Sequence, residues 1–413
     1  MSPLPLKLEL LTGLIAFLSF GCSSSTTSDG KSGSCTNNGA VIADAAPNSG
    51  ILKPFLSPKD PGARGIWFTA SGEILALGGY PFPPVTDIGF VDGWDVQFSE
   101  LLVTVDNIKL SQNPDLNPGD QSKTGREVAR VSGPWAIDLH QGGPLLGKAG
   151  SGEQAVAIAG LTGENANDCA PFDLTLRYAF GFDVVTATES ALNVNLDAQG
   201  LTDYAEMISK GYTVLYVGTA TFNGSSCVPD DPEFLKPPLT VGSVVNFRLG
   251  FKSPTSYINC QNPDYQSAAH FTGEEFQRGI YAYSNKTSIA QVTIHTDHPF
   301  WDNTVHDAPM HFDQIAARYV GTTGVPTAVV EDFVTVDWTH FTDAQGSVVP
   351  WRNCVESQCG KGAAKNWCPP DNGTMHFANV DGAPLANYAD FMTYNQRTQG
   401  HLNSDGLCYV KPR

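Results

Sequence analysis

The 413-residue chain has few charged residues and is especially poor in basic ones. Charged residues make up 16% of it, and 24 Lys and Arg stand against 42 Asp and Glu, for a formal net charge of −18. A phosphate backbone is bound by a basic face, so this balance argues against a nucleic acid as partner. Walker, Rossmann and nucleophile-elbow motifs are also absent from the sequence, so no motif indicates a nucleotide-binding enzyme or a serine hydrolase.

The apolar run near the N-terminus, residues 10–20, is about half as long as a transmembrane helix needs to be. It follows Lys7 and ends at Gly21 and Cys22, an arrangement typical of an export signal. The segment resembles the lipobox of bacterial lipoproteins, although Ser19 stands where that family prefers Leu. We therefore predict a signal peptide over 1–21, a lipid anchor on Cys22 and a flexible Ser/Thr/Gly-rich tether over 22–50. The expected location is the outer membrane, facing the periplasm or the cell surface; the alternative is a secreted protein in which Cys22 is incidental.

The nine cysteines include no CxxC pair. Without Cys22 eight remain, an even number, which in an oxidising compartment predicts up to four disulfides. Zinc ligation by Cys354, Cys359 and Cys368 is the alternative. Four of the eight lie in the last 60 residues. We therefore expect a disulfide-stapled C-terminal extension over 346–413.

Glycine and proline are abundant, at 41 and 28 residues, and they separate short runs of β-branched and aromatic residues. Such runs occupy 65–84, 94–98, 101–110, 172–182, 212–222 and 243–251, and most alternate apolar with polar residues. This pattern predicts a mainly β protein, an antiparallel β-sandwich with long loops over 51–345. Short helices are expected after Asp203, where Gly211 is the stop signal, after Thr272, and over 312–320 and 387–396.

Four of the nine histidines fall within seventeen residues, at His295, His298, His306 and His311. The acidic residues among them are Asp297, Asp302, Asp307 and Asp313. Imidazole is the commonest neutral ligand of zinc and copper, so the cluster predicts a transition-metal site. His295 and His298 converge on one ion only where the strand breaks before Pro299. His270, His340, His376 and His401 are isolated and are interpreted as structural.

The stretch His295-Thr-Asp297-His298-x-Phe-x-Asp302, with Phe312-Asp313-x-Ile-Ala after it, resembles the MbnP-like family of periplasmic copper-binding proteins. The segments over 93–110, 135–140 and 211–222 resemble it too, so the likeness covers roughly 90–320. The resemblance implies a β-sandwich, an extracytoplasmic location and a His-ligated copper site. It also implies an oxidisable tryptophan near the metal, for which Trp301 and Trp135 are the candidates. His140 enters the ligand set chiefly through this resemblance. The calcium-loop-like run of many relatives is missing here.

Three functions are compatible with these residues. The first is a lipoprotein that captures or hands over a metal without turnover; Met310 beside the histidines favours copper over zinc. The second is a structural or adhesive surface lipoprotein without metal. The third is a zinc-dependent hydrolase, because His-x-Asp-His resembles the end of the metallo-β-lactamase motif, but Thr293 stands where that motif begins with histidine. With an unperturbed histidine pKa near 6.5, metal binding is expected to fail below about pH 5–6.

Overall fold

The computed structural model describes residues 52–55, 57–85, 88–150, 152–163, 172–224, 240–265, 269–304, 306–338, 346, 349 and 385–413. The predicted signal peptide, Cys22 and the tether lie outside these residues. So do His340, His376 and all cysteines except Cys260 and Cys408. Among the described residues no helix is both long enough and apolar enough to cross a bilayer.

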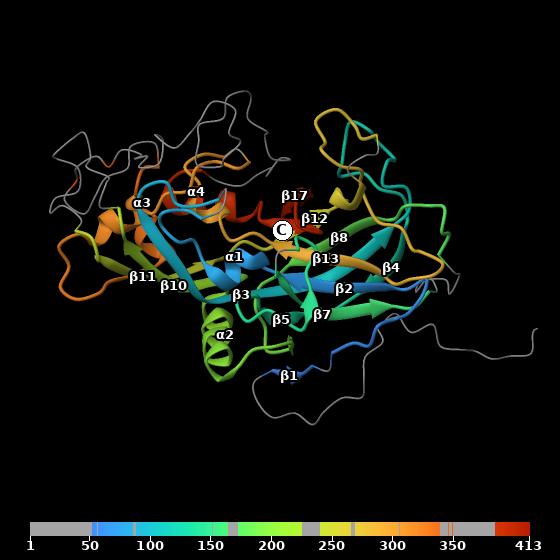
Figure 1. The fold of residues 1–413 in the computed structure, drawn as a ribbon, viewed down its shortest axis with the longest axis horizontal. Coiled ribbons are helices and arrows are strands. Elements are labelled where there is room, and N and C mark those ends of the chain that lie inside the picture. Colours follow the sequence, from blue (N-terminus) through green and yellow to red (C-terminus); the bar gives the residue numbers. More distant parts are fainter. Residues whose placement is uncertain are drawn as a thin grey trace, which may run out of the picture. The chain divides into compact units, whose positions relative to one another are not determined.

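The strands of this region fall into two sheets (Figure 1). The strands of the larger sheet are β1 (Lys53–Pro54), β3 (Trp94–Ser111), β4 (Glu127–Val131), β5 (Trp135–Asp138), β8 (Ala179–Val184), β9 (Leu192–Asn193), β10 (Val214–Phe222), β11 (Val244–Phe251), β12 (Thr255–Ile258), β14 (Thr327–Ala328) and β17 (Tyr409–Pro412). The strands of the smaller sheet, in spatial order, are β16 (Gly406–Leu407), β15 (Gly400–Leu402), β13 (Ser288–Ile294), β2 (Ile66–Ser71), β7 (Gln154–Leu161) and β6 (Leu145–Leu146).

Helical segments in the described part of the chain are few and short. The α-helices are α1 (Glu73–Gly78), α2 (Ala198–Lys210), α3 (Asp313–Ala316) and α4 (Tyr388–Gln396). The 3-10 helices are η1 (Pro263–Tyr265), η2 (His298–Phe300), η3 (Ala317–Tyr319) and η4 (Val330–Phe333). The prediction of a mainly β fold is thereby confirmed. Both sheets are mixed rather than purely antiparallel, because β13 runs parallel to β2 in the smaller sheet and β11 runs parallel to β14 in the larger.

One hydrophobic core joins the two sheets. Phe68 of β2 and Val292 of β13 belong to it together with Val103 of β3 and Tyr216 of β10, and all four are fully buried. A second apolar cluster lies around α2, where Tyr204 packs with residues of β3 and β10. Alternation along these strands places one set of side chains in each cluster, as the period of two in the sequence predicts.

The helix predictions succeed where the start and stop signals are strong. Gly211 ends α2 in the left-handed conformation, as expected, but the helix begins several residues before Asp203, because Asp197 is its N-cap and accepts a hydrogen bond from the Gly200 amide. The helix expected after Thr272 is absent; those residues form turns. Part of the run 65–84, which was expected to contribute strands, forms α1.

The C-terminal residues belong to the sheets. β15 pairs with β13 and β17 pairs with β12, both antiparallel. A disulfide between Cys260 and Cys408 joins the chain after β12 to the chain before β17. The expectation of disulfides near the C-terminus is confirmed for this pair; the other expected pairs lie outside the described residues.

Candidate metal centre

The end of β13 brings two of the predicted histidines together. The strand ends at Ile294, His295 follows it, and the 3-10 helix η2 begins at His298 with Pro299 in its first turn. This break occurs where the sequence predicts it, and it turns His298 toward His295. A third histidine comes from β15, because Thr293 of β13 pairs with His401. The His295 amide also donates to the Gln399 carbonyl at 2.9 Å, which secures this register beyond the strand.

One ring nitrogen from each of His295, His298 and His401 lies within 4.8 Å of the other two. The rings of His295 and His401 are stacked with centroids 4.0 Å apart, while the ring of His298 crosses them edge-on at 5.5 and 5.4 Å. His298 and His401 are 0% exposed. Zinc and copper bind imidazole nitrogens about 2.0–2.1 Å from the ion, so three nitrogens this close can be brought onto one ion by small ring movements.

The cluster also contains polar atoms that its protein neighbours leave unsatisfied. Nε2 of His295 and both ring nitrogens of His401 are buried without a hydrogen-bond partner in normal geometry. Buried polar groups nearly always have a partner, and leaving one without it is costly. A metal ion in this position supplies that partner to one nitrogen of each ring, so the residues present fit a transition-metal ion.

The tautomer of His298 is set by residues at the end of α4. The Thr398 hydroxyl donates its hydrogen to the Asn395 carbonyl at 2.6 Å. Nδ1 of His298 lies 2.7 Å from the same oxygen. Because the hydroxyl has one hydrogen, its oxygen can only accept from Nδ1–H of His298. The Nε2 atom of His298 therefore carries the lone pair, which is the arrangement that a ligating histidine needs.

Replacing Thr398 by valine is expected to weaken metal binding about 10- to 100-fold, because the ring of His298 loses the partner that fixes its tautomer and orientation. Thr393→Val is the matched control, since Thr393 also lies on α4 but bonds only within the helix, to the Ala389 carbonyl. Competition of each variant with a chelator measures the change. Equal affinity in Thr398→Val and Thr393→Val would show that Thr398 has no orienting role.

Trp301 closes one side of the cluster. Its ring stacks on His298 with centroids 3.8 Å apart, and its Nε1 donates to Asp297 Oδ2 at 3.1 Å. Burial raises the pKa of Asp297 to about 6. The aromatic ring and the carboxylate thus lie directly behind a candidate ligand, where they can influence the ion without binding it.

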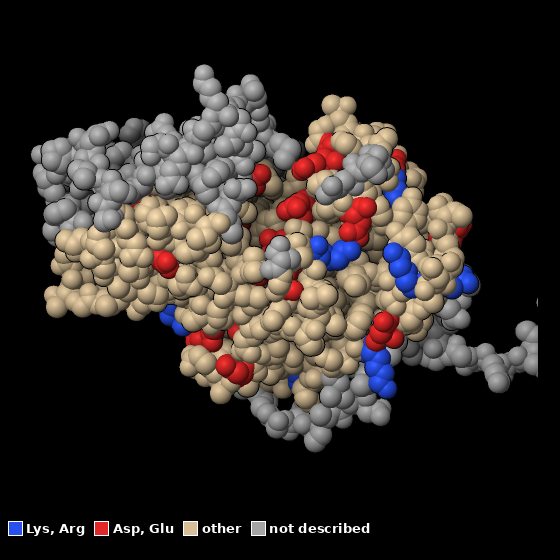
Figure 2. All heavy atoms as spheres, in the orientation of Figure 1, with Lys and Arg blue, Asp and Glu red and all other residues tan. Residues whose placement is uncertain are grey.

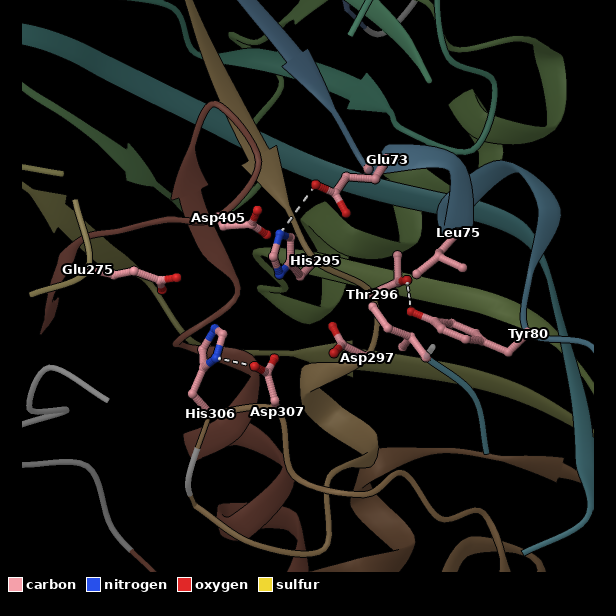
Figure 3. Close-up of a pocket in the computed structure, with 12 residues that line it drawn as sticks. Glu73, Leu75, Tyr80, Glu275, His295, Thr296, Asp297, His306, Asp307 and Asp405 are labelled. Atoms are coloured by element: carbon pink, nitrogen blue, oxygen red, sulfur yellow. Dashed lines mark hydrogen bonds and ion pairs between the residues drawn. The ribbon is translucent and has the colours of Figure 1, made fainter. Parts of the chain in front are cut away.

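A pocket of about 230 Å³ opens beside the cluster (Figure 3). Among the described residues its walls carry five carboxylates and two histidines but no Lys or Arg; these carboxylates and histidines are Glu73, Glu275, His295, Asp297, His306, Asp307 and Asp405. Figure 2 shows acidic side chains gathered around a hollow in the middle of the face it presents. A low-dielectric cleft lined by one sign of charge raises the local concentration of the opposite sign, here of cations.

The three imidazoles differ in charge. Burial by itself lowers the pKa of His295, but the Glu73 carboxylate, whose Oε1 is 3.5 Å from Nε2 of His295, outweighs it and raises that pKa to about 10. The same pairing lowers the pKa of Glu73 against the effect of burial. Burial and the neighbouring imidazoles keep the pKa of His298 and of His401 well below the ordinary value. At neutral pH the metal-free cluster therefore holds one imidazolium and two neutral rings.

The other predicted residues lie around the cluster or away from it. His306 lines the pocket beside Asp307, with its ring 6.0 Å from that of His401. His311 is buried elsewhere, with Nε2 3.1 Å from Asp302 and Nδ1 3.8 Å from Asp92.

Two candidates contributed by the resemblance lie on β5 or just after it. Nδ1 of His140 bonds to the Ala76 carbonyl of α1 at 2.7 Å. Trp135 lies in the hydrophobic core. Neither His140 nor the His311–Asp302 pair belongs to a group of candidate ligands found among the described residues.

Sequence reasoning missed three residues of this region: His401, Glu73 and Asp405. His401 was interpreted as structural because it stands alone in the sequence, more than 100 residues after His295. The stretch Gly400–Leu402, which forms β15, has only three residues and is too short to predict a strand partner. No family model, characterised protein or solved structure matches the chain. The functional argument therefore depends on the geometry of the cluster.

Proposed function

We propose that the protein binds a transition-metal ion at His295, His298 and His401 and hands it on as cargo, without chemical turnover. The observation that carries the proposal is the convergence of three imidazoles, two of which are fully buried and neutral at ordinary pH. Neutral imidazole suits copper and zinc alike, and at a given nitrogen site copper(II) binds more tightly than zinc. Copper is therefore the first choice and zinc the alternative. Met310, whose place beside the histidines in the sequence favoured copper over zinc, is part of the hydrophobic core.

The proposed setting is outside the cytoplasm, on a lipid anchor at Cys22. Two features support it: the short apolar run that ends at Cys22, and the Cys260–Cys408 disulfide, since disulfides form and persist in oxidising compartments. The resemblance to the MbnP-like family points the same way. In this setting the acidic pocket faces the medium from which cations are drawn.

The test is titration of the purified mature protein with Cu²⁺ and Zn²⁺ beside the variant His401→Leu. The variant removes one ligand from a fully buried position and replaces it with an apolar side chain that can stay buried. We expect it to bind about 100- to 1,000-fold more weakly, since three or four ligands together supply about 10–16 kcal/mol at structural zinc sites. His270→Leu is the control, because His270 is exposed and outside the cluster. Wild-type protein that binds neither ion would sink the proposal and favour the adhesive lipoprotein.

A further inference from the structure

A second group of candidate ligands adjoins the three histidines. One ligand atom each from Glu73, His295 and Asp405 lies within 4.8 Å of the others. His295 belongs to both groups, so the two groups meet at one side chain. Figure 3 shows Glu73 and Asp405 close to the ring of His295, and all three residues line the pocket.

The two carboxylates come from separate elements that a hydrogen bond joins. Glu73 is the first residue of α1 and has a positive φ of 61°, a conformation rare for a residue with a side chain; its amide donates to the Ser71 hydroxyl at 2.9 Å. Asp405 lies in the turn between β15 and β16, directly after Ser404. The Ser404 hydroxyl donates to Glu73 Oε1 at 2.7 Å, so the turn and the helix are joined at this point.

His295 supplies the observation that points to a cation rather than to a chance cluster of acids. Its Nε2 is buried and makes no hydrogen bond of normal geometry within the described residues; its charged neighbour is Glu73, with Oε1 at 3.5 Å. That gap is too long for a good hydrogen bond. An ion between His295 and the two carboxylates would satisfy both sides at once, in a pocket whose described lining includes no Lys or Arg.

We propose that Glu73, His295 and Asp405 form an outer subsite that takes a divalent transition-metal ion from solution and passes it to the inner subsite of His295, His298 and His401. The outer subsite offers two oxygen donors and one nitrogen donor, and the inner one offers three nitrogens, which copper and zinc prefer. His295 stays bound while the carboxylates are exchanged for the two buried imidazoles. Two dications this close would repel each other strongly, so a single ion uses the subsites in turn. This inference rests on the proposed function and adds the route by which the ion arrives.

Stopped-flow mixing with Cu²⁺ tests the route. Asp405→Asn removes one outer ligand and leaves the inner three intact, so we expect association to slow about tenfold while the equilibrium affinity changes less than about threefold. Glu275→Gln is the matched control, because it removes the same charge from the pocket wall without removing a member of the triad. It should slow association less than about threefold.

Electron paramagnetic resonance of bound Cu²⁺ gives the second readout. Wild-type protein should show coupling to three nitrogens, whereas His401→Leu, loaded at higher Cu²⁺, should hold the ion in the outer subsite with coupling to one nitrogen. If wild-type protein binds neither Cu²⁺ nor Zn²⁺, the proposed function fails. If it binds with three nitrogens but Asp405→Asn associates at the wild-type rate, or His401→Leu shows no one-nitrogen signal, the outer subsite alone is refuted.

Discussion

Raising the pH from about 6 to about 9 is expected to strengthen metal binding about a thousandfold. The reason is His295. The Glu73 carboxylate overcomes the effect of burial and raises the pKa of His295 to about 10, so this ligand is protonated in the metal-free protein throughout that range. An ion must displace its proton, and each binding event releases it. Affinity therefore rises about tenfold for each pH unit until the pKa of His295 is reached.

This pH dependence differs from the one expected of a histidine with an ordinary pKa. With three pKa values near 6.5, binding would level off above about pH 7.5. His298 and His401, whose pKa values are depressed by burial, contribute little to the slope near neutral pH. Below about pH 6 the slope should steepen, because Asp297, with a pKa of about 6, loses the negative charge that attracts the ion. The sequence alone predicts that metal binding fails at mildly acid pH. With the raised pKa of His295, that failure is the lower end of a decline in affinity that begins as the pH falls below that pKa.

Glu73→Gln is the control for this prediction. Without the carboxylate, burial prevails and the pKa of His295 falls, so the variant's affinity should be nearly constant between about pH 8 and about pH 9. Competition with a chelator of known pH dependence measures both proteins. A wild-type curve that is flat across the same interval would contradict the protonated His295 and the ion pair from which its raised pKa is inferred.

The parts of the fold that the sequence predicts are those with local signals. Alternation along 94–98 and 101–110 marks β3, and Gly211 marks the end of α2, because strand period and a left-handed cap are properties of neighbouring residues. The turn into α1 has no such signal: its helix starts at Glu73 in a left-handed conformation and lacks a side-chain N-cap. Parallel pairing of β2 with β13 joins segments more than 200 residues apart, and no local pattern encodes that register.

The residues of the candidate site also divide into those with a local sequence signal and those without one. His295 and His298 stand out because they are three residues apart with a proline after them, and the predicted strand break does turn them together. His401 reaches the cluster only through pairing of β15 with β13, and Glu73 only through the start of α1. A cluster of ligands that are close in sequence can be predicted from the sequence. A ligand that strand pairing brings into the cluster can be identified only from the fold.

Loss of the Cys260–Cys408 disulfide is expected to lower the free energy of unfolding by about 2–5 kcal/mol. The two cysteines are 148 residues apart in sequence, so the bridge closes a very long loop in the unfolded chain and restricts it strongly. The double variant Cys260→Ala/Cys408→Ala removes this bridge alone and leaves the other cysteines as they are. Chemical denaturation of the metal-free protein under non-reducing conditions measures the change.

Metal affinity gives a second measurement on the double cysteine variant. Cys408 follows β16, and β16 pairs with β15, which carries His401. If the bridge acts mainly on the unfolded chain, the folded double variant should keep its metal affinity within about tenfold while its C-terminal residues become easier to cleave by protease. Val410→Ala, which removes buried packing from β17 but keeps the bridge, separates loss of the cross-link from loss of contacts. An unfolding free energy equal to that of wild type in the double variant would show that the paired strands β12 and β17 hold this end of the chain without the disulfide.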